Sequence, residues 1–231
     1  MPSNKLSIVG HRGNHRSRLL YYLSQGVDFI EIDLNKSLGG ELISYHGDPL
    51  VTATTLTEAM LKKMLSLILR RDNPIRPLRF EEALELIGKR ARLWIDIKNR
   101  EVLKKALKTL SNWGYDEVIV SSNDYQALMY VKKEHKNITP DLKVRIAVSI
   151  SFKPPDIETL ETLVAKTGAS ILSVEYSVLD ETFLKYRELT GTRIAVWLVN
   201  SPWIMHRILQ FSPDYVITDR PDMIINELHN V

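Results

Sequence analysis

Apolar and amphipathic stretches alternate along the whole of this 231-residue chain. The apolar stretches are short and rich in valine and isoleucine, which is typical of buried strands. The amphipathic stretches have helical spacing, and several end at a glycine, as at Gly168 and Gly191. The predicted strands are 6–10, 27–34, 92–98, 117–122, 143–151, 169–177, 193–200 and 214–219, and the predicted helices are 16–26, 80–90, 101–114, 124–135, 156–168, 180–191, 202–212 and 221–231.

Eight strand–helix units in a chain of this length predict an α/β fold of the (β/α)8, or TIM, barrel type. An open doubly wound sheet is the alternative, but the sequence lacks the G-x-G-x-x-G turn of a dinucleotide site. We expect one domain over 1–231, because no Pro-, Gly- or Ser-rich linker divides the chain. Residues 37–78 break the alternation. A turn at 39–40, a short strand and a helical pattern over 55–70 predict an insertion on the face where barrel active sites lie.

The composition excludes several classes of protein. An apolar content of 44% is that of a folded globular protein, and no apolar run approaches the roughly 18 residues of a membrane span. The chain has no cysteine, which excludes disulfides and thiolate ligands. The absence of cysteine fits a reducing interior, and the apolar run near the start is too short for a secretory signal. We therefore expect a cytoplasmic protein. The net charge of +3 is spread among both signs, which gives no basic stripe for nucleic acid.

The predicted strand FIEIDLNKS carries two carboxylates within an apolar run. Glu31 and Asp33 are two positions apart and therefore lie on the same side of the strand, where burial would be costly without a partner. The strand RLWIDIK repeats the pattern with Asp96 and Lys98. Because the carboxyl ends of barrel strands converge on one mouth, we expect these four side chains to meet there.

Further polar residues fall at the same end of the predicted strands. His11 and Arg12 follow the first strand, and His46 lies in the insertion. Three carboxylates without a thiolate favour one hard divalent cation, Mg²⁺ or Ca²⁺. Arg12 and Lys98 could neutralise phosphate oxygens, and the two histidines are candidates for general acid and base. The combination indicates metal-assisted attack at phosphorus.

The chain resembles the glycerophosphodiester phosphodiesterases in five ordered segments between Val9 and Asp222, which are GHRG, GVDFIEIDLNKSLGGELISYHGDPL, WIDIKN, VWLVN and YVITDRPD. The resemblance implies hydrolysis of a glycerophosphodiester to glycerol 3-phosphate and an alcohol. It implies these site residues: metal ligands at Glu31, Asp33 and Asp96, an acid/base pair at His11 and His46, and phosphate contacts at Arg12 and Lys98.

The chain departs from the family pattern at three places. NHRSRLLYY replaces the Glu-Asn-Thr run that usually follows HRG, the third carboxylate is Asp96 rather than Glu, and His46 is followed by Gly47-Asp48 instead of Asp directly. These features also resemble the related spider-venom sphingomyelinases D, whose disulfides are absent here. We therefore expect the hydrolase class, with the alcohol and the head group left open.

Two other functions stay open at this point. A phospholipase D acting on lysophospholipids would use the Met- and Leu-rich pattern of 55–70 as a lipid-facing lid, with transient contact to a membrane surface. An amphipathic helix packed on the barrel would have the same pattern. A barrel that only binds phosphate esters is compatible with the fold, but a usable side chain occupies every position of the proposed set.

Three more residues have alternative interpretations. Glu175 either reaches the barrel mouth or pairs with a basic neighbour, and Trp197 either belongs to the core or contacts substrate. Both are candidates for substrate binding. Asp219 precedes Arg220-Pro221, and we expect it to cap the last helix.

We expect His46 to deprotonate the attacking hydroxyl and His11 to protonate the leaving oxygen. The attacker is either water or the neighbouring glycerol hydroxyl, which would first give a cyclic phosphate. The sequence leaves both attackers open, and the reverse assignment of the two histidines as well.

Overall fold

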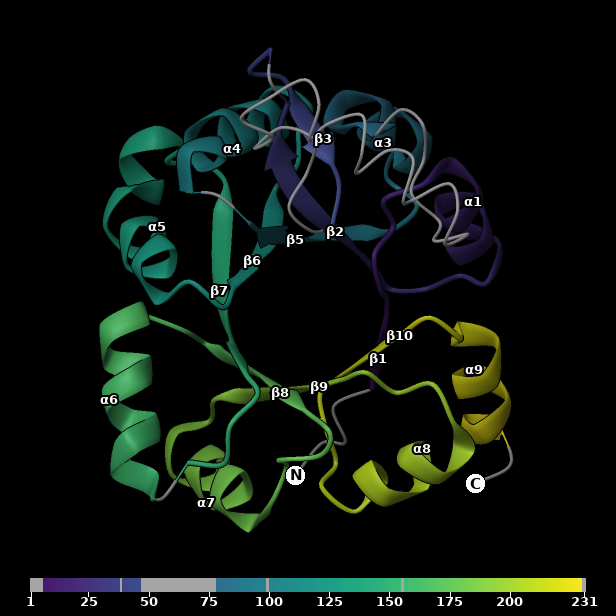
Figure 1. Cartoon of the computed structure of the whole chain (residues 1–231), viewed down its shortest axis with the longest axis vertical. Coiled ribbons are helices and arrows are strands. Elements are labelled where there is room, and N and C mark those ends of the chain that lie inside the picture. The colour runs from purple at the N-terminus through teal and green to yellow at the C-terminus, as the bar shows by residue number, and fades with distance from the viewer. Residues whose placement is uncertain (1–5, 38, 47–77, 99, 155, 230–231) are drawn as a thin grey trace, which may run out of the picture.

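The computed structural model describes residues 6–37, 39–46, 78–98, 100–154 and 156–229. Eight parallel strands pair around a closed barrel, and β1 completes the ring because it pairs with both β2 and β10 (Figure 1). The predicted TIM barrel is confirmed. Its strands are β1 (Ser7–Gly10), β2 (Phe29–Lys36), β5 (Arg92–Ile97), β6 (Glu117–Ser122), β7 (Lys143–Ile150), β8 (Ile171–Glu175), β9 (Arg193–Trp197) and β10 (Tyr215–Thr218).

Helices surround the barrel on the outside (Figure 1). They are α1 (Arg16–Ser24), α3 (Phe80–Ile87), α4 (Leu103–Asn112), α5 (Tyr125–Ile138), α6 (Ile157–Thr167), α7 (Glu181–Thr190), α8 (Pro202–Leu209) and α9 (Pro221–His229), with a 3₁₀ turn, η2 (Arg100–Val102). Gly168 and Gly191 end α6 and α7 in the left-handed conformation, as the sequence predicts. Within the described ranges, no helix combines the length and the apolar character that crossing a bilayer requires.

Side chains fill the barrel interior toward the amino ends of the strands. Phe29 and Trp94 each pack edge-on against Tyr215, with ring centroids 5.7 Å apart in both pairs. Smaller apolar residues complete this inner cluster, among them Val9, Ile119, Ala147, Ile171 and Ala195. The barrel is therefore a packed core and not a channel, and the space left for a ligand lies above it, at the carboxyl ends of the strands.

The segment after β2 turns back on that strand. β3 (Leu42–Ser44) pairs antiparallel with β2 and with β4 (Leu78–Arg79). The turn at 39–40 and the short strand are confirmed, whereas the helix predicted over 55–70 lies outside the described residues. The register places Ser44 beside Leu34, and the N–H of Tyr45 donates to the carbonyl of Asp33 at 2.9 Å. The insertion thereby brings His46 alongside Asp33.

Candidate active site

The turn after β1 holds His11 and Arg12 at the barrel mouth. A Cβ atom at Gly10 would lie 2.5 Å from the ring of Tyr22, and one at Gly13 would lie equally close to a side chain of β2. Only glycine therefore fits at these two positions, which flank His11 and Arg12. The close approach lets the Tyr22 hydroxyl donate to the carbonyl of His11 at 2.5 Å, which fixes the main chain where the histidine projects.

Arg12 has a left-handed backbone, with φ of 52°, which is uncommon for a residue other than glycine. In this conformation its N–H donates to Oε2 of Glu31 at 2.6 Å, so the turn orients the Glu31 carboxylate. Its Nε is buried without a hydrogen-bond partner among the described residues, and Oδ2 of Asp33 lies 3.8 Å away. The guanidinium is therefore only partly used by the protein itself.

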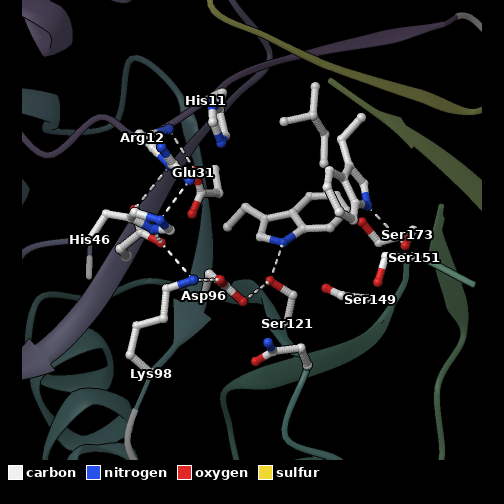
Figure 2. A pocket seen from close by; sticks show the side chains of 15 residues that line it. His11, Arg12, Glu31, His46, Asp96, Lys98, Ser121, Ser149, Ser151 and Ser173 are labelled. Carbon is white, nitrogen blue, oxygen red and sulfur yellow. Dashed lines mark hydrogen bonds and ion pairs between the residues drawn. The ribbon is translucent and has the colours of Figure 1, made fainter. Parts of the chain in front are cut away.

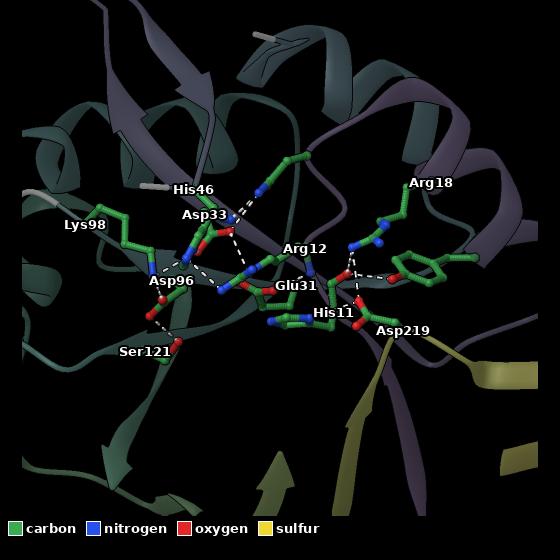
Figure 3. Close-up of polar contacts among 12 residues, drawn as sticks. His11, Arg12, Arg18, Glu31, Asp33, His46, Asp96, Lys98, Ser121 and Asp219 are labelled. Atoms are coloured by element: carbon green, nitrogen blue, oxygen red, sulfur yellow. Dashed lines mark hydrogen bonds and ion pairs between the residues drawn. The ribbon is translucent and has the colours of Figure 1, made fainter. Parts of the chain in front are cut away.

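Three carboxylates converge beside this turn (Figure 3). Oxygen atoms of Glu31, Asp33 and Asp96 all lie within 4.8 Å of one another. The pairing of β2 with β5 sets Asp33 directly beside Asp96. Glu31 and Asp33 are 5% and 1% exposed, and buried charges of one sign need a counter-charge. An all-oxygen cluster of this kind fits a hard divalent cation.

The electrostatics of the cluster agree with a cation site. Burial, followed by the charges of Asp33 and Asp96, raises the pKa of Glu31 well above its usual value. Burial also raises the pKa of Asp96. For Asp33, burial acts in the same direction, but its hydrogen bond with His46 and the charge of Lys98 outweigh it and hold the pKa below its usual value. A bound cation would replace the repulsion among these carboxylates by attraction.

Lys98 already pairs with two of the three carboxylates. Its ammonium lies 2.9 Å from Oδ1 of Asp33 and in direct contact with Asp96. Burial would lower the pKa of Lys98, but the two carboxylates outweigh it and raise the pKa. Ser121 donates to Oδ1 of Asp96 at 2.8 Å and accepts from Nε1 of Trp94, which fixes the orientation of that carboxylate.

Asn14 is a buried polar residue beside the carboxylate cluster that the sequence patterns did not single out. Its side chain is 3% exposed. Its amide donates to Oδ2 of Asp33 at 2.7 Å, and its carbonyl oxygen accepts from the N–H of Asp33 at 3.0 Å. A polar residue that follows the HRG turn so closely was the available signal. Asn14 orients Asp33 from behind, as the partners of metal-binding carboxylates commonly do.

The ring of His46 lies between Asp33 and Arg12. Its Nδ1 is 2.9 Å from Oδ1 of Asp33, and its Nε2 is 2.6 Å from Nη2 of Arg12. A guanidinium can only donate, so Nε2 accepts and Nδ1–H donates to the carboxylate. This tautomer has its lone pair on Nε2, which is the atom that a general base at the pocket would use.

His11 has a carboxylate partner of its own. Its Nδ1 lies 3.1 Å from Oδ1 of Asp219, which also accepts from Arg18, while Oδ2 accepts from Asn200. The prediction that Asp219 caps the last helix is wrong, because His11 and these neighbours occupy its carboxylate. Burial would raise the pKa of Asp219, but His11 outweighs it and lowers the pKa to about 2. Burial lowers the pKa of His11, and Asp219 opposes that shift.

These side chains surround a pocket of about 260 Å³, close to the lower end of the range for small-molecule sites. The pocket brings together most of the residues predicted from the sequence, namely His11, Arg12, Glu31, Asp33, His46, Asp96, Lys98 and Trp197. Glu175 is not among the lining residues that the structure describes. Its carboxylate accepts from the Ser177 hydroxyl at 2.9 Å. Serines on β6, β7 and β8 line the side of the pocket opposite His46 (Figure 2).

Comparison with known proteins identifies a family that this chain resembles. A model of the glycerophosphoryl diester phosphodiesterase family matches residues 91–223, which is more than half of the chain. The glycerophosphodiester phosphodiesterase of Caldanaerobacter subterraneus is 26% identical, over 96% of this chain and 97% of the relative. The enzyme of the same name from Bacillus subtilis is 23% identical, over 95% of this chain and 85% of the relative.

Solved structures share the fold. A glycerophosphodiester phosphodiesterase from Thermotoga maritima superposes with a TM-score of 0.71 at 22% identity, covering 96% of this chain and 97% of that chain. A phosphodiesterase from Oleispira antarctica, solved in complex with the product sn-glycerol-3-phosphate, has a TM-score of 0.70 at 19% identity and covers 96% of both chains.

Proposed function

Because this chain belongs to the glycerophosphoryl diester phosphodiesterase family, we propose that it hydrolyses glycerophosphodiesters to glycerol 3-phosphate and an alcohol. The observation that carries the proposal is the convergence of two histidines, two basic side chains and three carboxylates on one pocket at the barrel mouth. Acid, base and positive charge are the groups that cleavage of a phosphodiester requires.

Glu31, Asp33 and Asp96 are proposed to hold one divalent cation, Mg²⁺ or Ca²⁺. When bound, the cation would supply positive charge against the phosphoryl oxygens, an effect worth several kcal/mol. Arg12 and Lys98 add their own charges at the same place. The partly unused guanidinium of Arg12 supports this role, because a phosphate oxygen would provide the acceptors that it lacks.

The two histidines divide the proton transfers in this proposal. Nε2 of His46 takes the proton of the attacking hydroxyl once Arg12, which donates to this atom in the structure, turns to the phosphate, and Asp33 holds the ring through Nδ1. His11 gives a proton to the leaving oxygen, and Asp219 holds that ring in the same way. The attacking group is water or the neighbouring hydroxyl of the substrate glycerol. Each transfer contributes roughly 10²–10⁴ in rate.

Asp219→Asn should shift the pH dependence of kcat/KM. The carboxylate raises the pKa of His11 against the effect of burial, so its loss lowers that pKa further. A general acid with a lower pKa is protonated over a narrower range, and the alkaline limb should therefore move to lower pH. A hydrogen bond to a charged group is worth about 1.5–3 kcal/mol, which corresponds to a shift of about one to two pH units.

The matched control is Asp222→Asn. Asp222 also holds a tyrosine and an arginine by hydrogen bonds, yet it does not line the pocket. Its variant should keep the wild-type profile. If Asp219→Asn also kept that profile, or moved the acidic limb instead, the assignment of His11 as the general acid would be wrong.

The products test the proposed reaction directly. Purified protein should convert soluble glycerophosphocholine or glycerophosphoglycerol to glycerol 3-phosphate and the free alcohol. The reaction can be followed by ³¹P NMR. With glycerophosphocholine as the substrate, release of glycerol together with phosphocholine would contradict the proposed bond cleavage. Turnover of lysophosphatidylcholine with no turnover of either soluble diester would replace the proposal by the phospholipase D alternative.

A further inference from the structure

We propose that the pocket wall opposite His46 selects substrates whose leaving alcohol is an uncharged polyol of about the size of glycerol. The inference rests on the proposed function and specifies its substrate class. The wall consists of Ser149, Ser151 and Ser173 and is called the serine wall below.

Sheet register builds the serine wall. Ser149 on β7 pairs directly with Ser173 on β8, and Ser151 follows Ser149 by two positions, so that it projects to the same side. All three line the pocket, and Figure 2 shows them across it from His46 and Arg12. The pocket thus has a charged side on β1 to β5 and a side of hydroxyl groups on β7 and β8.

The hydroxyl groups of the serine wall are available to a ligand. The hydrogen bonds found within the described parts of the chain use none of them, although Ser121 nearby binds both Asp96 and Trp94. Ser173 is only 3% exposed. Its hydroxyl is not among the buried unpaired side-chain atoms of the described residues, so it opens onto the pocket, where a ligand hydroxyl can reach it.

The chemistry of the wall matches a polyol better than an ammonium group. Serine hydroxyls both donate and accept, as the hydroxyls of a polyol do, and Asn123 adds an amide to the pocket lining. No carboxylate on this side lines the described pocket, because Glu175 is hydrogen-bonded to Ser177 instead. A cationic head group would lose hydration here without gaining a counter-charge.

The direction of attack assigns the wall to the leaving alcohol. In phosphoryl transfer the attacking and leaving oxygens lie roughly in line on opposite sides of phosphorus. His46 takes the proton of the attacker in the proposed mechanism, and the serine wall lies across the pocket from His46 (Figure 2). The alcohol that departs therefore faces Ser149 and Ser173.

The test compares glycerophosphoglycerol, glycerophosphocholine and glycerophosphoethanolamine as substrates for the wild type and for the Ser149→Ala/Ser173→Ala double variant. We expect the wild type to have the highest kcat/KM for glycerophosphoglycerol. The double variant should lose about tenfold or more on that substrate, mainly through KM, because each lost hydrogen bond is worth roughly 1 kcal/mol. Turnover of the other two diesters should change less than twofold.

Ser170→Ala is the matched control. Ser170 is an exposed serine just before β8, at the end of the strand away from the pocket, and its variant should match the wild type on every substrate. Equal losses on all three diesters would overturn the inference, since the wall would then hold the glycerol that they share. Unchanged kinetics, or a wild-type preference for choline, would also overturn it. If the wild type cleaved no diester, the proposed function itself would fail.

Discussion

Replacing His11 by alanine is expected to lower kcat by about 10²–10⁴, the usual contribution of a general acid, while binding of a divalent cation stays unchanged. The ring of His11 is held by Asp219 and not by the three carboxylates. Its removal therefore takes away a proton donor without disturbing Glu31 or Asp96. The measurement is steady-state turnover of glycerophosphocholine, with cation binding followed in parallel by titration calorimetry.

His206→Ala is the matched control for that variant. His206 lies on α8, pairs with Glu227 and does not line the pocket, so its loss should leave kcat within about twofold, the range expected for a surface substitution. Turnover by the His11 variant at a rate near that of the wild type would show that another group protonates the leaving oxygen. Loss of cation binding together with turnover would instead give His11 a part in the cation site.

Glu31→Gln is expected to separate the cation site from the fold. Glutamine keeps the length of the side chain, and its amide oxygen can still accept from the N–H of Arg12, but one of the three negative charges is gone. The rise in Tm that Mg²⁺ or Ca²⁺ produces should disappear. Activity should fall by about 10³-fold, since several kcal/mol of stabilisation are lost at ~1.4 kcal/mol for each factor of ten.

The same variant has a second expected signature. Without a divalent cation, Glu31 is buried against two other carboxylates, so removing its charge should raise the Tm of the metal-free protein by about 2–4 °C for each kcal/mol of repulsion relieved. Glu117→Gln is the control that should keep the response to the cation, because Glu117 begins β6, at the end of that strand away from the pocket. A Glu31 variant that kept both the response and the activity would remove Glu31 from the proposed ligand set.

The sequence predicted the parts of the site that are local in the chain. Glu31 and Asp33 lie two positions apart on a strand, and the spacing alone puts them on one side. The barrel followed from the alternation of strands and helices, and the convergence of strand ends then brought Asp96 and Lys98 to the same mouth. These inferences needed the period of a strand and the closure of the barrel, but no knowledge of distant contacts.

Asp219 and the serine pair, which the sequence did not place, depend on the pairing of neighbouring strands in the barrel. Asp219 meets His11 across 208 positions, and only because β10 pairs with β1. The pairing of Ser149 with Ser173 depends in the same way on the register of β7 against β8. Glu175 has the strand spacing of Ser173, but it is the last residue of β8, and its carbonyl already accepts from Val178 in the following turn.

The most direct test of the central claim is release of glycerol 3-phosphate by the wild-type protein, with glycerophosphoglycerol and glycerophosphocholine as substrates and with EDTA, Mg²⁺ or Ca²⁺ in parallel. The account predicts no release in EDTA and restored release with at least one of the two cations, because Glu31, Asp33 and Asp96 would then hold their cation. Equal release in EDTA and in the presence of either cation would contradict the role given to this cluster.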